Sequence, residues 1–330
     1  MSSKSIIGIG NALMDIVVTI PDDSILVKNN LPKGSMTLID VETSSILNLQ
    51  TKHFNRILAP GGSVANTIHG LANLGSKASY IGMVGNDEMG RIYQYELERI
   101  GAKPHLFHSE TSTGVALALV TPDHERTFGT YLGAAVELSD NELSSSLFEG
   151  YDIAYIEGYL VQNQDLIRKA AILAKESGML IALDLASYNV VTANIEFLKE
   201  LVADYVDIIF ANEEEAHAFT GKGPEESVEI LSGLCKVAVV KTGEKGSLIK
   251  HNGILTKIGI AGTDCIDTTG AGDQYAAGFL YGFAQSFPIE TCGKIAAIMA
   301  GKVISVYGAR VEEHMWEEVK NEIAKLQNCL

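Results

Sequence analysis

The sequence predicts an α/β fold, with a doubly wound, mostly parallel sheet flanked by helices, and two observations lead to it. Short β-rich runs alternate with helical stretches along most of the chain, which is typical of βαβ units. Several runs, such as VDIIF and VAVVK, are continuously apolar, which fits strands buried on both faces. The expected strands are residues 6–10, 78–82, 152–157, 180–184, 207–210 and 237–241.

Helices are expected between and after these strands. Residues 87–100 carry apolar side chains at helical spacing, and Pro288 suits the first turn of a helix. The chain has no internal repeat, low-complexity tract or linker, so one domain should span residues 1–330. The C-terminal third is expected to form helices over residues 270–283, 288–307 and 312–328.

Some strand-like segments break this alternation, because no helix separates them from their neighbours. The segments are residues 13–20, 36–40, 114–121 and 126–132. They predict a small antiparallel sheet that is inserted within about 13–58 and 104–134. From the residues alone, a lid over a site and a decoration of the main sheet are equally good interpretations.

Composition and charge exclude several classes of function. The chain has 330 residues, 46% hydrophobic and 20% charged, which excludes disorder as its main state. Its 25 Lys and Arg against 41 Asp and Glu give a net charge of −16, and so acidic a surface repels nucleic acid. No apolar run approaches the roughly 18–20 residues of a membrane span. We therefore expect a cytoplasmic protein without nucleic-acid or membrane partners, whose four separated cysteines are reduced.

The segment DTTGAGD at 267–273 is the strongest candidate for a chemical site. Gly270, Ala271 and Gly272 place backbone N–H groups without bulky side chains at the start of a helix, where free amides and the helix dipole attract anions. Asp273 is then positioned to accept a proton from an attacking hydroxyl. Taken alone, a glycine-rich turn with an ordinary charge at a helix N-terminus explains the segment equally well.

A second glycine-rich segment, GGSVAN at 61–66, opens another helix. Gly61 and Gly62 would let the backbone approach a small polar ligand, and Asn66 would hydrogen-bond a hydroxyl. The alternative is a glycine turn in which Ser63 caps the helix.

Polar residues also follow three of the expected strands. Asn11 and Asp15 come after the first strand, and Asp15 lies in an apolar stretch where a carboxylate needs partners such as sugar hydroxyls. Asn212 and Glu215 follow VDIIF, where they either bind Mg²⁺ through water or cap a helix, and the cap is favoured for this segment alone. The segment KTGEKG at 241–246 fits a hairpin turn or a nucleotide loop.

Together these segments resemble the signatures of the ribokinase-like (PfkB) family of carbohydrate and nucleoside kinases. GGSVAN at 61–66 is similar to the N-terminal signature and DTTGAGDQYAAGFL at 267–280 to the C-terminal one, with N-x-x-E at 212–215 between them. The resemblance covers nearly the full length of the chain. It implies the ribokinase-like fold, with the inserted sheet as a lid.

The resemblance also implies roles for individual residues. ATP would be the phosphoryl donor and Asp273 the base that deprotonates the acceptor. Mg²⁺ would be bound through water by Glu215, and Asp267 and Thr269 match positions that bind a monovalent cation, K⁺, in many members. The implied anion hole is Gly270, Ala271 and Gly272, the implied nucleotide site is Asn212, Glu215, Lys241, Gly243 and Gly246, and the implied acceptor site is Asn11, Asp15, Gly61, Gly62, Asn66, Arg126 and Glu157.

The acceptor is open between a nucleoside and a free sugar. The start GIGNALMDIVV and Arg126 in HERTFGTYLGAA resemble the adenosine-kinase branch, whereas Glu157 in YIEGYL resembles a substrate-side position of sugar kinases. We favour an adenosine-like nucleoside over fructose or ribose. A non-catalytic ligand-binding protein is a remote alternative because the motif residues are intact, and both a monomer and a homodimer are open. A purine base would need an apolar slot. The residues that would line it, or would simply pack within the lid, are Leu13, Met14, Met36, Phe128 and Tyr131.

Overall fold

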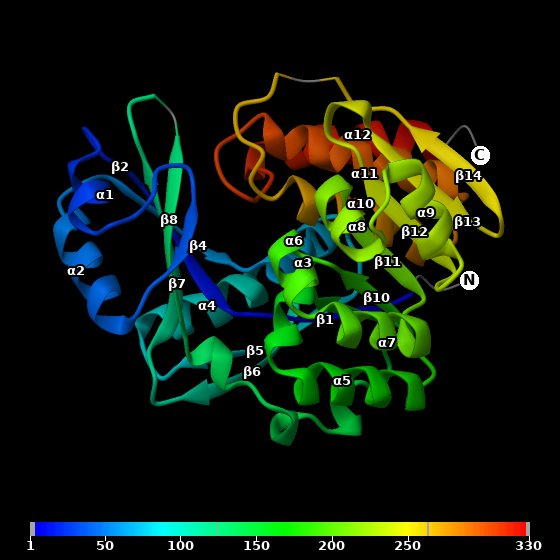
Figure 1. The fold of residues 1–330 in the computed structure, drawn as a ribbon, viewed down its shortest axis with the longest axis horizontal. Coiled ribbons are helices and arrows are strands. Elements are labelled where there is room, and N and C mark those ends of the chain that lie inside the picture. The colour runs from blue at the N-terminus through cyan, green and yellow to red at the C-terminus, as the bar shows by residue number, and fades with distance from the viewer. Residues whose placement is uncertain (1–3, 124, 263, 328–330) are drawn as a thin grey trace.

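The computed structural model describes residues 4–123, 125–262 and 264–327, and its centre is a nine-stranded sheet (Figure 1). The strand order is β14-β13-β12-β11-β10-β9-β1-β5-β6. Pairing is parallel from β12 to β6, and the hairpin of β13 and β14 adds an antiparallel edge. The strands are β1 (Ile6–Ile9), β5 (Ala78–Gly85), β6 (Lys103–Ser109), β9 (Ile153–Glu157), β10 (Leu180–Asp184), β11 (Ile208–Asn212), β12 (Val237–Lys241), β13 (Ser247–His251) and β14 (Ile254–Ile258).

The expected mostly parallel sheet is confirmed, and its strand order determines where a ligand can bind. The chain runs outward from β1 to β5 and β6, and then returns to the other side of β1 with β9, β10, β11 and β12. The direction of winding therefore reverses between β1 and β9. In open α/β sheets such a reversal leaves a crevice outside the carboxyl ends of the strands.

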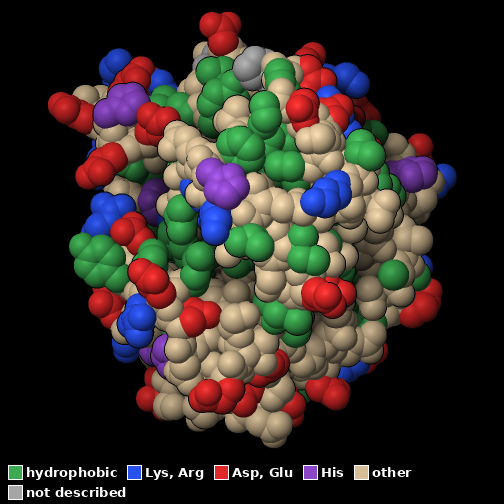
Figure 2. Space-filling view, turned by 90° about the vertical axis from the view of Figure 1, so that its left-hand side faces the viewer, with side chains coloured by type: hydrophobic (Ala, Val, Ile, Leu, Met, Phe, Trp, Pro, Cys, Tyr) green, Lys and Arg blue, Asp and Glu red, His purple; other side chains and the backbone are tan. Residues whose placement is uncertain are grey.

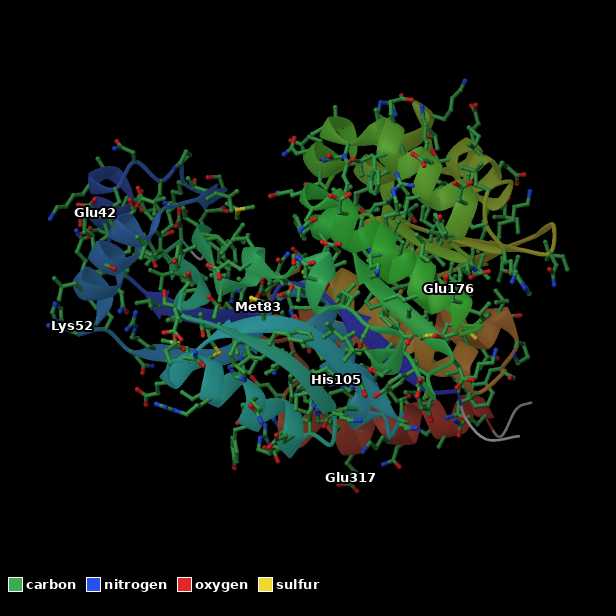
Figure 3. All side chains as sticks on the ribbon, turned by 90° about the horizontal axis from the view of Figure 1, so that it is seen from below. Glu42, Lys52, Met83, His105, Glu176 and Glu317 are labelled. Atoms are coloured by element: carbon green, nitrogen blue, oxygen red, sulfur yellow. The ribbon has the colours of Figure 1, made fainter. Side chains whose placement is uncertain are left out.

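Helices cover both faces of the main sheet and form two separate cores. Tyr80, Tyr155 and Phe210 are buried on one face, and Glu176 in α5 and Glu317 in α12 lie on opposite sides of the sheet (Figure 3). On the face of Tyr80 lie α3 (Ser63–Asn73), α4 (Glu88–Arg99), α10 (Ala271–Ala284), α11 (Ile289–Ile304) and α12 (Trp316–Gln327). On the other face lie α5 (Gln164–Glu176), α6 (Tyr188–Ala193), α7 (Ile195–Tyr205), α8 (Glu213–Thr220) and α9 (Pro224–Ser232).

The three C-terminal helices are present with small differences from the expected bounds. Helix α11 ends at Ile304, earlier than the expected residue 307. A 3₁₀ turn, Glu313–Met315, precedes α12, and residue 328 of the last expected helix lies outside the described residues.

A second, five-stranded sheet lies at one end of the molecule (Figure 1). Helices α1 (Ser24–Lys28) and α2 (Val41–Thr51) cover one of its faces, where Ile16, Leu47 and Leu117 are buried together. The expected inserted sheet is thus present. In spatial order its strands are β3 (Met36–Leu38), β8 (Arg126–Gly133), β7 (Thr113–Val120), β2 (Leu13–Thr19) and β4 (Arg56–Gly61).

The inserted sheet differs from the expectation in two respects. Residues 104–109, expected within it, belong to β6, which pairs in parallel with β5 at the edge of the main sheet. Helix α4 provides the long crossover that such parallel pairing needs. The inserted sheet is also mixed rather than antiparallel, because β2 pairs in parallel with β7, which the chain reaches only after passing through the main sheet.

The surface agrees with the acidic composition. Figure 2 shows the end of the molecule that carries the small sheet, with Asp and Glu side chains scattered over it rather than gathered in one patch. Within the described ranges, no helix is both long enough and apolar enough to cross a lipid bilayer.

Candidate active site

Five polar side chains stand at one edge of the main sheet, where its parallel strands end. Asn11 follows β1, and Glu157, Asp184, Asn212 and Lys241 are the last residues of β9, β10, β11 and β12. Because these strands are parallel neighbours, the five residues share the carboxyl edge, beside the reversal of strand order. Sequence reasoning singled out four of them and missed Asp184, although it also ends a buried strand.

The glycine-rich turn before α10 leaves backbone donors without partners. Gly270 has φ +74°, and a Cβ there would lie 2.5 Å from the Cα of Ala309, so only glycine fits. The N–H of Ala271 donates within the turn, whereas the N–H groups of Gly272 and Asp273 have no acceptor among the described residues. Two free N–H groups at the positive end of a helix form a place where an anion is stabilised.

Asp273 stands in the first turn of α10, and α3 holds its carboxylate. Its Oδ1 accepts a hydrogen bond from Ser63 Oγ at 2.7 Å, and its Oδ2 accepts one from Asn66 Nδ2 at 3.0 Å. Burial raises the pKa of Asp273 to about 6, although these two hydrogen bonds lower it. Asp273 is therefore ionised at neutral pH but more basic than an ordinary Asp. The alternative interpretation of this segment made Ser63 the cap of its helix. In the structure Ser63 contacts Asp273 instead and does not cap the helix.

Two glycines bring the start of α3 close to β2. Gly62 has φ +94°, and a Cβ there would lie 2.2 Å from the carbonyl oxygen of Asn11. A Cβ on Gly61 would lie 2.1 Å from the carboxyl carbon of Asp15. Burial raises the pKa of Asp15 to about 7, and the positive charge of Arg310 opposes the rise. The backbone at Gly61 therefore lies against the Asp15 carboxylate, and the backbone at Gly62 lies against the carbonyl oxygen of Asn11.

Lys241 puts a positive charge at the start of α10. Its Nζ lies 3.1 Å from Oδ2 of Asp184 and 3.1 Å from the point that a Cβ on Gly272 would occupy. Burial opposes the charge, but the carboxylates of Asp184 and Glu215 raise the pKa of Lys241 above its ordinary value. The ammonium is therefore charged across the physiological range and lies close to Gly272 in the first turn of α10.

Asn212 and Glu215 form a capping box at the start of α8. The Glu215 carboxylate accepts hydrogen bonds from the backbone N–H and the Nδ2 of Asn212, at 2.8 and 2.7 Å. Burial raises the pKa of Glu215 to about 7, Lys241 lowers it and Asp184 raises it. Each carboxylate oxygen keeps a lone pair for water, so a contact with Mg²⁺ through water would leave the cap intact, and the residues fit this ion.

Glu157 lies beneath the start of α3 and is only 2% exposed. Its Oε1 accepts a hydrogen bond from Asn11 Nδ2 at 2.8 Å, and its Oε2 accepts one from the N–H of Val64 at 3.3 Å. Burial raises the pKa of Glu157 to about 7. The contacts of Glu157 therefore hold Asn11 and the first turn of α3.

Gly243 and Gly246 lie in the tight turn between the antiparallel strands β12 and β13. Gly246 has φ +88°, and a Cβ there would lie 1.9 Å from the carbonyl oxygen of Ile258, so the hairpin itself requires glycine. A Cβ on Gly243 would meet no atom within 4 Å. The turn continues from Lys241, which places both glycines at the carboxyl edge of the sheet.

Arg310 is a residue of this region that the sequence did not indicate. Its Nε donates a hydrogen bond to Oδ1 of Asn66 at 3.1 Å, and Asn66 in turn donates to Asp273. Its charge also acts on Asp15, whose pKa it lowers against the effect of burial. Arg310 is 244 residues from Asn66 along the chain, so only the packing of the C-terminal segment on α3 reveals it.

Arg126 reaches from the small sheet to the turn before α10. Its Nη1 lies 2.7 Å from Oδ2 of Asp267 and 3.4 Å from Oγ1 of Thr269. Arg126, Asp267 and Thr269 therefore form one cluster in the structure. The sequence resemblance had assigned Arg126 to the acceptor and the other two residues to a monovalent cation.

Comparison with known proteins identifies the family. The family model described as pfkB family carbohydrate kinase matches residues 34–315. The chain belongs to the pfkB family of carbohydrate kinases. The ribokinase-like fold implied by the two signatures is thereby confirmed.

Solved structures of a sugar kinase and an adenosine kinase match nearly the whole chain. A probable sugar kinase from Rhizobium etli CFN 42 is 32% identical, with a TM-score of 0.88 over 99% of this chain and 100% of that one. The adenosine kinase from Sinorhizobium meliloti is 33% identical, with a TM-score of 0.87 over 97% of this chain and 100% of that one. A 5-dehydro-2-deoxygluconokinase from Listeria monocytogenes is 25% identical over 324 residues, which are 90% of this chain and 100% of the relative.

As a pfkB kinase, the protein is a phosphotransferase that acts on an alcohol group of a small sugar or nucleoside.

Proposed function

We propose that this kinase transfers the γ-phosphoryl group of ATP to a primary hydroxyl of a nucleoside, with an adenosine-like acceptor. The observation that supports the transfer is the position of Asp273. Burial raises the pKa of this carboxylate to about 6. Asp273 is the next residue after Gly272, whose N–H is free, and it lies close to the Lys241 ammonium. A base and an anion site side by side are what transfer between a hydroxyl and a phosphate requires.

Asp273 takes the proton that the acceptor hydroxyl loses as its oxygen bonds to phosphorus. At neutral pH the carboxylate is ionised, and its raised pKa makes it a stronger base than an exposed Asp. Ser63 and Asn66 hold one oxygen each, so the base is oriented before the acceptor binds. The proton ends on Asp273, and the electron pair of the breaking bond goes to ADP.

The negative charge of the transferring group is stabilised at the start of α10. The N–H groups of Gly272 and Asp273 and the ammonium of Lys241 lie there. Asp184 holds Lys241 in place at 3.1 Å. Mg²⁺ supplies further neutralisation of the ATP phosphates when it is bound, and Glu215 would hold it through water.

The small sheet supports a nucleoside rather than a bare sugar. Asp15 lies on the face that α1 and α2 leave uncovered, because the neighbouring Ile16 is buried against them. Residues directly opposite one another on neighbouring strands share a face. The register therefore places an apolar group beside Asp15, namely Val17, Ile57, Ala118, Phe128 and Met36.

This apolar group has room for a partner. Ile57 is 61% and Met36 is 53% exposed, so apolar surface is available beside the Asp15 carboxylate. A flat base would pack on it while Asp15 binds ribose hydroxyls. Of the residues that the sequence suggested for such a slot, Leu13, Met36 and Phe128 lie on this face, whereas Met14 and Tyr131 lie on the covered one.

A free sugar is the second candidate, because several relatives are sugar kinases and the polar groups around Asp15 would suit either acceptor. An acceptor screen at fixed Mg·ATP separates the two. We expect kcat/KM for adenosine to exceed that for fructose or ribose by roughly 10²-fold, since only the nucleoside covers the apolar group. A higher kcat/KM for a free sugar would contradict the nucleoside assignment.

The assigned base is tested with Asp273→Asn on the best acceptor. Turnover should fall by roughly 10²–10⁴-fold, the usual contribution of a general base. Asp165→Asn is the matched control, because Asp165 is also in the first turn of a helix but is exposed on α5. Wild-type turnover in Asp273→Asn would show that the base is another group, and tight nucleoside binding without phosphorylation of any acceptor would favour a non-catalytic binding protein.

A further inference from the structure

Arg126 joins the small sheet to the turn that precedes α10. Its guanidinium lies 2.7 Å from Oδ2 of Asp267, and the two side chains are only 10% and 8% exposed. The same guanidinium lies over the ring of Tyr307, 5.5 Å from its centroid. A partly stacked and nearly buried arginine of this kind is held in one position.

The carboxylate of Asp267 has no acceptor site left for another ligand. Oδ1 accepts hydrogen bonds from the N–H of Thr269 at 3.1 Å and from its Oγ1 at 2.7 Å. Oδ2 accepts one from the N–H of Gly308 at 2.7 Å, besides the contact with Arg126. A carboxylate offers about four such sites, so all of them are in use.

This donor set does not fit a bound monovalent cation. A cation on Asp267 would have to displace one of these donors and would meet the positive charge of Arg126 at close range. Thr269 offers no better ligand, because its Oγ1 donates to Asp267 and is also approached by Arg126 at 3.4 Å. The sequence resemblance implied K⁺ at Asp267 and Thr269, and the structure fills the place with a side chain.

We propose that Arg126 is a built-in replacement for the monovalent cation of this turn. Its charge holds Asp267, and through Asp267 it holds the N–H groups of Thr269 and Gly308, so the turn keeps the shape that leaves the start of α10 free for an anion. Arg126 thus acts as a positioning residue through the turn, and turnover is independent of K⁺. The inference rests on the phosphoryl transfer proposed above.

The test is the dependence of turnover on K⁺ in the full-length enzyme, with tetramethylammonium as the only other monovalent cation at constant ionic strength. Wild-type kcat should change by less than about two-fold between zero and about 100 mM K⁺, the size of a general salt effect. Arg126→Ala should lose up to about 100-fold in kcat through misplacement of the turn. K⁺ or millimolar guanidinium should then restore a saturable part of the lost rate, which a merely structural role would not allow.

Arg168→Ala is the matched control. Arg168 has the same kind of contacts, 2.7 Å from Oε1 of Glu200 and 5.2 Å over the ring of Phe197, but it lies on α5. Its removal should leave kcat unchanged and create no response to K⁺ or guanidinium.

Three results would overturn the inference. They are a saturable K⁺ activation of the wild type by about tenfold or more, an unchanged kcat in Arg126→Ala, and a loss of kcat in that variant that neither cation relieves. If Arg126→Ala does not fold, wild-type Tm provides the decision: K⁺ at constant ionic strength should leave it unchanged, and an increase contradicts the proposal. Failure of the kinase assignment itself would look different, because the wild type would then phosphorylate no acceptor in any salt.

Discussion

Replacing Lys241 by Met removes the buried ammonium at the start of α10 while keeping most of the side-chain volume. In the wild type its Nζ lies 3.1 Å from Oδ2 of Asp184 and 3.1 Å from the point that a Cβ on Gly272 would occupy. Its loss leaves Asp184 and Glu215, 5% and 3% exposed, without the cation between them. We therefore expect two effects, a weaker stabilisation of the transferring phosphoryl group and a less stable fold.

The size of the first effect follows from the geometry. The ammonium lies close to Gly272, and for a phosphoryl group about 4 Å away two unit charges interact by about 4 kcal/mol at an effective dielectric constant near 20. Because about 1.4 kcal/mol is a factor of ten in rate, the upper limit is roughly 10³-fold. Water that enters the vacated space recovers part of this, so kcat/KM for ATP should fall by roughly 10²–10³-fold.

Steady-state kinetics with the best acceptor, together with Tm, measure both effects. Lys175→Met is the control, since Lys175 pairs at 2.5 Å with the buried Asp207 at the opposite edge of the sheet. The double variant Lys241→Met, Asp184→Asn removes the uncompensated carboxylate, so it should regain stability without regaining turnover. The reasoning is refuted if Lys241→Met stays within about tenfold of wild type, or if the double variant restores the full rate.

The remaining predictions concern the carboxylates and the backbone around them. Burial raises the pKa of Asp273 to about 6 and that of Asp15 to about 7, so kcat/KM should rise with pH through about 6–7, and a limb near 4 would contradict the assignment of both groups. Asn66→Ala removes a hydrogen bond that lowers the pKa of Asp273, so the acidic limb of the pH profile should move to higher pH, and an unmoved limb would separate Asn66 from the base. Gly62→Ala should lower the free energy of unfolding by about 2–5 kcal/mol, through a positive φ and a close contact, and Gly75→Ala, which has a similar φ and no neighbour within 4 Å, by about 1–2 kcal/mol. Urea unfolding compares the two glycine variants, and equal losses would contradict the contact argument.

The two glycine-rich turns could be predicted from the sequence because their requirements are local. Gly270 and Gly62 each have a positive φ one residue before a helix, at +74° and +94°. Such needs leave a glycine in the sequence whatever the distant packing is. The polar ends of the buried strands, such as Asn212 and Lys241, were predictable for a related reason, since a parallel sheet brings all its carboxyl ends to one edge.

Contacts between distant segments could not be predicted in the same way. Arg310 touches Asn66 only because the C-terminal segment packs on α3, and no spacing in the sequence encodes that meeting. The pairing of Arg126 with Asp267 likewise depends on where the small sheet lies over the turn. Residues 104–109 were expected in the small sheet because a short strand has the same sequence pattern in either sheet. Only the strand it pairs with, β5, shows that it belongs to the main sheet.

The placement of Asp273 itself argues against a protein that merely binds an anion. A carboxylate beside the free N–H groups of α10 repels a resting phosphate, and burying it there costs stability, as its raised pKa shows. For ligand binding alone, Asn at this position would keep the hydrogen bond from Ser63 without the repulsion. The charge is explained by the proposed role of Asp273 as the proton acceptor, for which its hydrogen bonds from Ser63 and Asn66 would orient it. The buried charge of Asp273 therefore supports the proposed phosphoryl transfer over a site that only binds an anion.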